Sequence, residues 1–210
     1  MAIGVSKFPK KKVSRYKNIR RFIQSGDLLF CSGNKWTSRT IRAATGSCWS
    51  HIAFVMRLDA IDRIMVMESV ESQGVRTVPL SKYLKNYDNR NQPYDGGVAI
   101  GRHGKFDGIV SKKRLKKFAR RAVQLLGHRY DRDEIAKICG RIVASHLPFS
   151  KNETVRLERD NEYICSEYVW ECYRSLGIEI PNDTRGFVSP ADFARAEEVA
   201  LLYVLQGIGV

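Results

Sequence analysis

The sequence predicts an α+β domain in which helices pack on an antiparallel sheet. Short apolar segments rich in sheet-forming residues fill the first half of the chain, and helical periodicity dominates the second half. The 210 residues fit one ordinary domain, and a hydrophobic content of 43% is enough for a core. We expect residues 1–20 to form a basic, partly disordered arm and residues 21–210 to form the domain.

The expected strands are short and separated by turn-forming residues. One helix, WTSRTIRAAT at 36–45, is expected to interrupt them. The strands are SGDLLFCSG at 25–33 (opening with a turn), HIAFVM at 51–56, RIMVMES at 63–69, GVRTVPL at 74–80, GGVAIGR at 96–102 and ALLYVLQ at 200–206.

Helical spacing of apolar residues predicts three further helices. They lie at 106–127, with Gly127 as the C-terminal stop, at 131–147 and at 165–176. On the last of these, Cys165 and Cys172 are two turns apart and share one face. The two cysteines are not equivalent, because Cys165 lies at the helix start whereas Cys172 lies inside, where it would be buried.

The charge is strongly basic, with a formal net charge of +14 and a pI near 9.8. It is concentrated in the arm and in KKRLKKFARR at 112–121. Such clusters attract anionic cell-wall polymers, anionic membrane surfaces or nucleic acid, of which nucleic acid is not favoured. The chain has no long apolar run and no secretory signal at its start, so we expect a cytoplasmic protein or a phage or virion product.

The cysteine and histidine pattern argues against disulfides and metal sites. Five cysteines at irregular spacing do not make a disulfide framework, and without a CxxC pair or clustered histidines a zinc site is not expected. We expect neither a metal nor an organic cofactor. His103, His128 and His146 are interpreted as surface or loop residues.

A thiol nucleophile needs a lowered pKa, a base and donors for the developing oxyanion. A helix N-terminus supplies free amides and the positive end of the helix dipole, which places Cys165 well and gives Ser166 a first-turn position. His51 opens the strand 51–56 as a candidate base. If that strand pairs antiparallel with the next, Glu68 at the end of 63–69 lies beside His51 and orients it.

Four motifs in a particular order resemble a known family. GDLLF, SHIAFV, LGHRYD and YICSEYVWECY resemble the NlpC-type papain-like peptidases, but here the cysteine helix comes last. That order is similar to the circularly permuted YiiX-like amidases and, more distantly, to lecithin:retinol acyltransferase. Ala53 stands where many relatives have glycine, and Tyr168 where leucine is usual.

The resemblance implies a permuted papain-like fold and a cysteine hydrolase or acyltransferase that needs no cofactor. Cys165 would be the nucleophile, His51 the base and Glu68 the orienting group, with Glu71 as a rival for that role. Tyr130 in LGHRYD, Asp27 in GDLLF and Ser166 would serve the oxyanion or the substrate. The substrate would be a cell-wall peptide or an amide- or ester-linked lipid. The alternatives are a polyanion-binding module with a decayed site and a structural virion protein.

Overall fold

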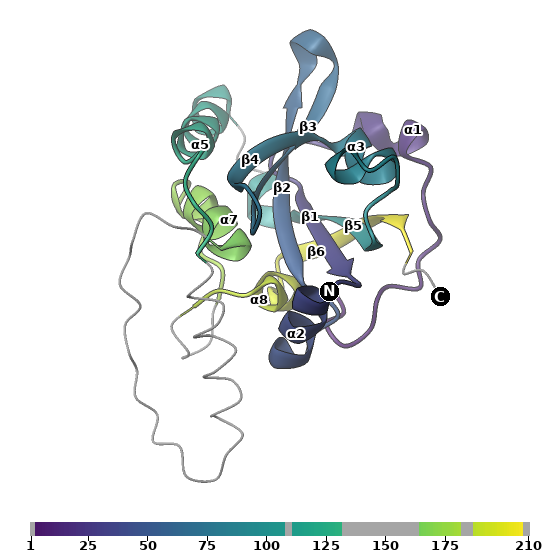
Figure 1. Cartoon of the computed structure of the whole chain (residues 1–210). Helices are drawn as coiled ribbons and strands as arrows, with labels where there is room; N and C mark the ends of the chain where they lie inside the picture. Colours follow the sequence, from purple (N-terminus) through teal and green to yellow (C-terminus); the bar gives the residue numbers. More distant parts are fainter. Residues whose placement is uncertain (1–2, 108–110, 132–163, 182–186, 208–210) are drawn as a thin grey trace, which may run out of the picture.

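One antiparallel sheet forms the centre of the computed structural model, which describes residues 3–107, 111–131, 164–181 and 187–207. The strand order is β4-β3-β2-β1-β5-β6 (Figure 1). The strands are β1 Leu28–Gly33, β2 His51–Leu58, β3 Arg63–Val70, β4 Gly74–Pro79, β5 Gly96–His103 and β6 Val199–Gln206. Each coincides with a predicted strand to within a few residues, and the α+β class is confirmed.

The helices are short and lie around the sheet. They are α1 Tyr16–Ile19, α2 Trp36–Thr45, α3 Leu80–Lys85, α4 Gly104–Asp107, α5 Lys112–Gln124, α7 Cys165–Arg174 and α8 Pro190–Arg195. The helix predicted at 106–127 is replaced by two, α4 and α5. Helices α3 and α8 were not predicted, because six residues are too few to show a 3.6-residue period. The helix predicted at 131–147 falls outside the described residues, apart from its first residue.

Strand alternation sends side chains to two separate cores. Phe54 of β2 faces α5 and α7, where its ring centroid lies 4.7 Å from that of Phe118 and 5.6 Å from that of Tyr168. Its neighbours Ala53 and Val55 belong to the other core, beneath α3. Helices α5 and α7 accordingly lie on one side of the sheet, with α1 and α3 on the other (Figure 1). Within the described ranges no helix is long and apolar enough to cross a membrane.

The basic arm packs against the sheet along much of its length. Ile3 is buried, and the Trp49 indole donates a hydrogen bond to the Gly4 carbonyl at 3.0 Å. Farther on, Val13 forms a parallel bridge with Val204 of β6. Burial of Ile3 and the backbone bridge at Val13 are the contacts by which this lysine-rich segment, expected to be partly disordered, lies against the sheet.

Asp27 corrects one expectation about the site. Its buried carboxylate accepts hydrogen bonds from the Arg102 side chain at 2.6 and 3.0 Å and from the Gln24 amide at 2.8 Å. In the β1–β2 register His51 pairs with Cys31, four residues farther along β1. At about 3.3 Å per residue, Asp27 lies roughly 13 Å from that position and so does not belong to the site around His51.

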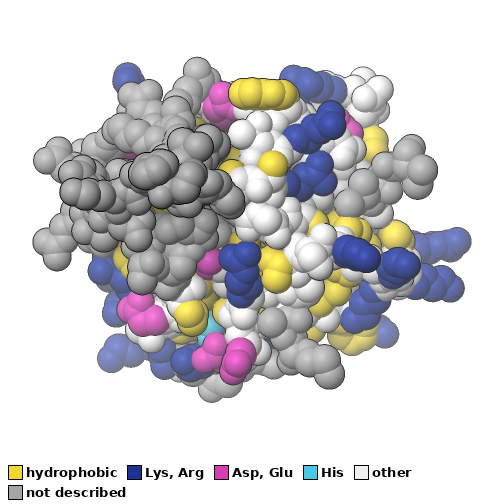
Figure 2. Space-filling model, turned by 90° about the horizontal axis from the view of Figure 1, so that it is seen from below, with side chains coloured by type: hydrophobic (Ala, Val, Ile, Leu, Met, Phe, Trp, Pro, Cys, Tyr) yellow, Lys and Arg dark blue, Asp and Glu magenta, His cyan; other side chains and the backbone are white. Residues whose placement is uncertain are grey.

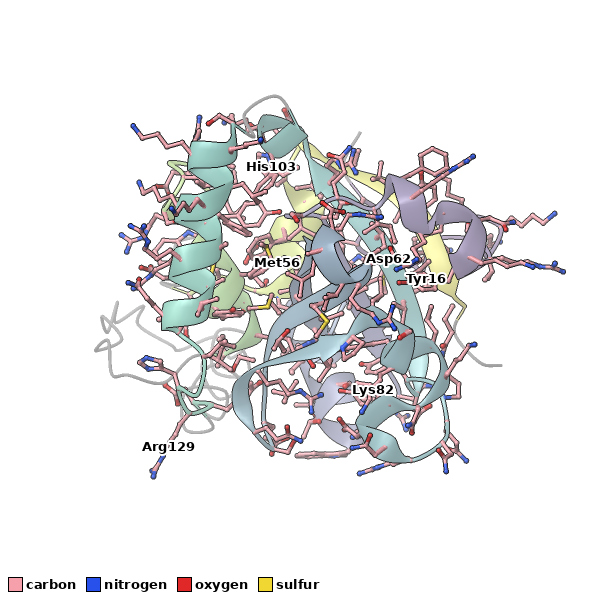
Figure 3. The ribbon with its side chains drawn as sticks, turned by 90° about the horizontal axis from the view of Figure 1, so that it is seen from above. Tyr16, Met56, Asp62, Lys82, His103 and Arg129 are labelled. Carbon is pink, nitrogen blue, oxygen red and sulfur yellow. The ribbon has the colours of Figure 1, made fainter. Side chains whose placement is uncertain are left out.

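We predict that Asp27→Asn destabilises the fold by about 3 kcal/mol or more, because it leaves the largely buried Arg102 guanidinium without its carboxylate. Asp62→Asn is the matched control, since Asp62 pairs with Arg20 at the exposed β2–β3 turn near Tyr16 (Figure 3). We expect that change to cost about 0–1 kcal/mol. Urea denaturation measures both, and equal effects would contradict a structural role for Asp27.

Candidate active site

Helix α7 begins at Cys165 because the residues around it cap its N-terminus. Ile164 has extended backbone angles, and its carbonyl accepts the Tyr168 amide at 3.1 Å. The Glu167 carboxylate reaches back to accept the Ile164 amide at 3.2 Å. This local pattern places the Cys165 side chain in the first turn, where backbone amides lack helical partners and the helix dipole is positive.

Strands β2 and β3 separate from each other near Cys165. Strands β2 and β3 pair from Leu58–Arg63 to Phe54–Met67 and pair no further. Beyond that point β2 stays with β1 as far as His51, and β3 stays with β4 as far as Val70. Residues 51–53 and 68–70 therefore face each other across a gap without ladder hydrogen bonds.

The gap leaves the Ile52 amide without a partner on β3, and this amide donates toward Cys165 instead. In an antiparallel strand successive amides point to opposite neighbours. The Val55 amide points to β1, where it bonds the Asp27 carbonyl at 2.8 Å, so the Ile52 amide points toward the β3 side. Both the Ile52 amide and the Ser166 amide donate toward the Cys165 sulfur. The division of the sheet thus supplies a thiolate-binding amide.

His51 joins the cysteine to a carboxylate. Its Nε2 lies 3.0 Å from Glu68 Oε2, and its ring is also in hydrogen-bond contact with Cys165. Because Nε2 faces Glu68, Nδ1 is the nitrogen left for the sulfur. The exposed fraction is 4% for Cys165 and zero for Glu68. The structure therefore brings Cys165, His51 and Glu68 together in that order, with only the histidine in contact with the cleft.

Electrostatics favour a thiolate–imidazolium pair. Burial by itself would raise the pKa of Cys165, but the His51 charge, its hydrogen bond and the two backbone amides outweigh it and lower the pKa. Burial would lower the pKa of His51, yet Cys165 and Glu68 raise it to about 10. Each member of the pair stabilises the charged form of the other, which favours the thiolate–imidazolium pair over the neutral thiol and imidazole.

Glu68 remains ionised because three partners surround it. Burial would raise the pKa of Glu68, but His51, Arg76 and Tyr83 together lower it. Arg76 Nε donates to Oε1 at 2.9 Å, and the Tyr83 hydroxyl donates to Oε2 beside His51. Arg76 and Tyr83 were not predicted as site residues. Arg76 could have been found from the register of the tight β3–β4 hairpin, which pairs it with Glu68.

Tyr130 lies near the reacting group, whereas the Ser166 hydroxyl is enclosed. Burial raises the pKa of Tyr130, and the charge of Cys165 contributes to this rise, so the phenol is a neutral donor. Ser166 is fully buried, and its hydroxyl has no hydrogen-bond partner among the described residues. Ser166 therefore contributes its backbone amide to the site. The rival Glu71 lines the same cleft, but Glu68 is the carboxylate in contact with His51.

A cleft of about 780 Å³ opens beside His51. Its walls come from the start of α2, the β3–β4 turn and the segment before β5, with Tyr130 as a further lining residue. Most of the lining side chains carry polar or charged groups, among them Asn34, Ser50, Glu71, Asp88, Asp95 and Gln206. A substrate in this cleft reaches the imidazole edge next to Cys165.

The other described cysteines, Cys31, Cys48 and Cys172, are buried, which was expected for Cys172. Burial raises the pKa of Cys31 and Cys172, and raises that of Cys48 to about 11, so all three are protonated thiols at neutral pH. His103 corrects an expectation, because it is buried at the end of β5 with its ring centroid 6.0 Å from that of Tyr173. No three His, Cys, Asp or Glu side chains gather at a possible metal site in the ranges that the structure describes.

Comparisons with known proteins identify a family and a similar fold. The family model described as permuted papain-like amidase enzyme, YaeF/YiiX, C92 family, matches residues 22–186. No curated protein gives a significant match. The crystal structure of metalloprotein yiiX from Escherichia coli O157:H7 is similar with a TM-score of 0.58 and 21% identity, covering 86% of this chain and 96% of that chain. At this identity the likeness concerns the fold alone.

We predict that iodoacetamide alkylates Cys165 far faster than Cys172 and that the rate falls little between pH 8.5 and pH 6.5. An ordinary thiol, with a pKa of about 8.5, would lose most of its thiolate over that range. Cys165 keeps its thiolate because its pKa is lowered. Peptide mapping by mass spectrometry after timed labelling gives the two rates.

His51→Ala is the informative variant, because it removes the cation that lowers the Cys165 pKa. The rate at pH 6.5 should then fall toward that of an ordinary buried thiol. Equal, slow labelling of all five cysteines in the unmodified protein would contradict the ion pair.

Proposed function

The chain belongs to the permuted papain-like amidases, which are cysteine hydrolases, and we propose that it acts through a Cys165–His51–Glu68 triad on the amide bond of a peptide. The observation that carries the triad is the contact of His51 with both Cys165 and Glu68 at the N-terminus of α7. The fold by itself does not select the substrate, so the substrate is argued from the cleft.

In the first half-reaction the Cys165 thiolate attacks the carbonyl carbon and forms a carbon–sulfur bond. The carbonyl oxygen becomes an oxyanion, which the free Cys165 amide in the first turn of α7 and the Tyr130 hydroxyl stabilise. His51 then gives its proton to the leaving nitrogen as the carbon–nitrogen bond breaks. The products are a free amine and a thioester on Cys165.

In the second half-reaction the neutral imidazole of His51 takes a proton from water, and the resulting hydroxide attacks the thioester. The carbon–sulfur bond breaks, the acid leaves, and the thiolate–imidazolium pair is restored. Glu68 holds the imidazole in place and stabilises its charged form in both halves, which is the role that a third triad member has.

The lining of the cleft favours a peptide over a long acyl chain. Lys35 and Arg90 line it with positive charge, whereas the side chains of Asn34, Ser50 and Gln206 are already hydrogen-bonded within the protein. A chain of methylene groups would take water from the two cations without replacing it. A peptide, such as the cross-linking peptides of a cell wall, binds them with its own carbonyl oxygens and carboxylates.

A second function, binding to an anionic surface, is favoured by α5. Its outer face consists of five exposed cations, Lys112, Lys113, Lys116, Lys117 and Arg120. The helix contains no acidic residue, and no ion pair joins these five side chains to any other described residue. Side chains that end in nitrogen project from α5 away from the sheet (Figure 3). By contrast, Arg121 pairs with Glu171 of α7 at 2.7 Å and so contributes to the fold.

The charges on α5 oppose the stability of the helix itself. Lys112 and Lys113 lie at the positive end of the helix dipole, where acidic residues are preferred. Lys112 with Lys116, and Lys113 with Lys117, are like charges four residues apart, and each such pair destabilises a helix by about 0.2–0.5 kcal/mol. Because the fold gains nothing from these charges, we assign them to a partner. Lys and Arg side chains are also scattered over the face of the molecule seen from below (Figure 2), in keeping with the net charge of +14.

We assign the outer face of α5 to an anionic lipid surface. Its cations lie along one stripe of a straight helix, so a flat layer of headgroups meets all of them at once. The stripe carries no aromatic side chain on which nucleic-acid bases would stack. Each lysine near an anionic membrane contributes about 1 kcal/mol.

The hydrolase proposal predicts a thioester on Cys165. The protein is mixed with a panel of peptide amides and long-chain N-acyl amides and quenched in acid, and its intact mass is measured. We expect acyl adducts from peptides, located at Cys165 and lost in Cys165→Ala. Adducts from N-acyl amides alone would overturn the peptide assignment. The absence of any adduct, together with unreactive Cys165, would overturn the hydrolase.

The surface proposal predicts binding to vesicles that contain phosphatidylglycerol and none to vesicles of phosphatidylcholine alone. Replacing Lys112, Lys113, Lys116 and Lys117 by glutamine should weaken binding by about 100-fold or more, at about 1 kcal/mol for each lysine. A control with four arm lysines (Lys7, Lys10, Lys12 and Lys17) replaced has the same net charge and should bind more tightly than the α5 variant. Equal loss in both, or tighter binding to duplex DNA at the same salt, would contradict the assignment.

A further inference from the structure

A chain of ionic contacts runs from the cleft wall to the base of the proposed triad. Asp88 contacts Arg76, Arg76 contacts Glu68, and Glu68 contacts His51. We propose that Arg76 is a positioning residue, which fixes the Glu68 carboxylate against His51 and thereby holds Cys165 as a thiolate. This inference rests on the proposed triad and goes beyond it, because it adds a residue that acts through Glu68 rather than on the substrate.

The guanidinium of Arg76 is bound on two sides. Its Nε donates to Glu68 Oε1 at 2.9 Å, and its NH1 nitrogen lies 3.0 Å from Asp88 Oδ1. The side chain is 10% exposed, and the centroid of the Tyr87 ring is 5.9 Å from the guanidinium carbon. The contact with Asp88 is an ion pair and not a hydrogen bond, because Asp88 Oδ1 has no hydrogen-bond partner among the described residues. The donation from Nε to Glu68 has a direction fixed by the planar guanidinium, which a lysine ammonium does not reproduce.

The contact with Arg76 determines which partner each Glu68 oxygen binds. Arg76 binds Oε1, which turns Oε2 toward His51 and the Tyr83 hydroxyl. If Arg76 were absent, the carboxylate could rotate in its pocket, and His51 would be the remaining cation in contact with it among the described residues. The orientation of the imidazole therefore depends on a residue of β4 that does not touch the cysteine.

The far end of the chain of contacts is part of the cleft. Asp88 lines the cleft and has left-handed backbone angles, with φ of 51°. Asn89 and Asn91 in the same segment also have positive φ, at 60° and 56°. Non-glycine residues adopt this conformation when surrounding contacts hold them there. The Arg76–Asp88 ion pair is such a contact. Arg76 therefore contacts both the wall of the cleft, through Asp88, and the carboxylate that orients His51.

The loss of Arg76 has a defined electrostatic sign. If Glu68 stays ionised, the site loses a positive charge, and the Cys165 thiolate becomes less favourable. If Glu68 takes up a proton instead, the imidazolium of His51 loses its counter-charge, and the thiolate again becomes less favourable. Both routes raise the pKa of Cys165, so the direction of the effect does not depend on which group responds.

The test is the pH profile of Cys165 alkylation by iodoacetamide in Arg76→Met, Arg76→Lys and Arg57→Met. In Arg76→Met the midpoint of the rate–pH profile should move upward by about one pKa unit or more, which is a tenfold change in the ionisation constant of the thiol. Arg76→Lys should fall between Arg76→Met and the unmodified protein, since it keeps the charge but loses the planar guanidinium. Arg57→Met should keep the original profile, because Arg57 pairs with Asp59 near the other end of β2.

A thermal melt of each variant separates positioning from folding, because a merely structural arginine would lower the melting temperature and leave the pH profile of the folded protein unchanged. An unchanged profile in Arg76→Met, or full recovery in Arg76→Lys, would overturn the inference. If Cys165 in the unmodified protein already titrates as an ordinary thiol, the triad itself fails. The two failures are thus distinguishable.

Discussion

The site depends on keeping one carboxylate ionised inside the protein. Glu68 is fully buried, and a buried carboxylate without compensation would take up a proton. His51, Arg76 and Tyr83 reverse that tendency and lower its pKa. An ionised Glu68 supports a charged His51, and a charged His51 supports the Cys165 thiolate. The reactivity that we propose for Cys165 on α7 therefore depends on the surroundings of Glu68 on β3.

The division of the sheet is what allows these groups to meet. A continuous β2–β3 ladder would place His51 and Glu68 on a closed surface and would consume the Ile52 amide. Because pairing stops at Phe54 and Met67, the side chains of His51 and Glu68 meet across the gap, and the first turn of α7 approaches a free amide. The energetic cost of a few lost ladder bonds is offset by charge-assisted hydrogen bonds to a thiolate.

Two buried carboxylates each pair with an arginine, but the surroundings of the two pairs differ. Asp27 and Glu68 are both almost inaccessible, and each is bonded to an arginine on a neighbouring strand. The Asp27–Arg102 pair lies at the start of β1 and joins that strand to β5. The pair of Glu68 with Arg76 has a histidine on its second oxygen and a cleft beyond it. Residue type and burial alone do not separate a structural ion pair from one in the proposed triad, whereas the third partner does.

The positions of the strands along the chain, the helix start at Cys165 and the adjacency of His51 and Glu68 follow from the sequence alone, because they rest on local periodicity, capping and the pairing of consecutive strands. Tertiary structure alone decided the roles of Asp27, Arg76 and Tyr83. Asp27 has a family motif around it, yet its partner Arg102 lies 75 residues away. Arg76 required the hairpin register, and Tyr83 required a helix too short to show a period. Contacts between distant segments depend on register and packing, which no local pattern records.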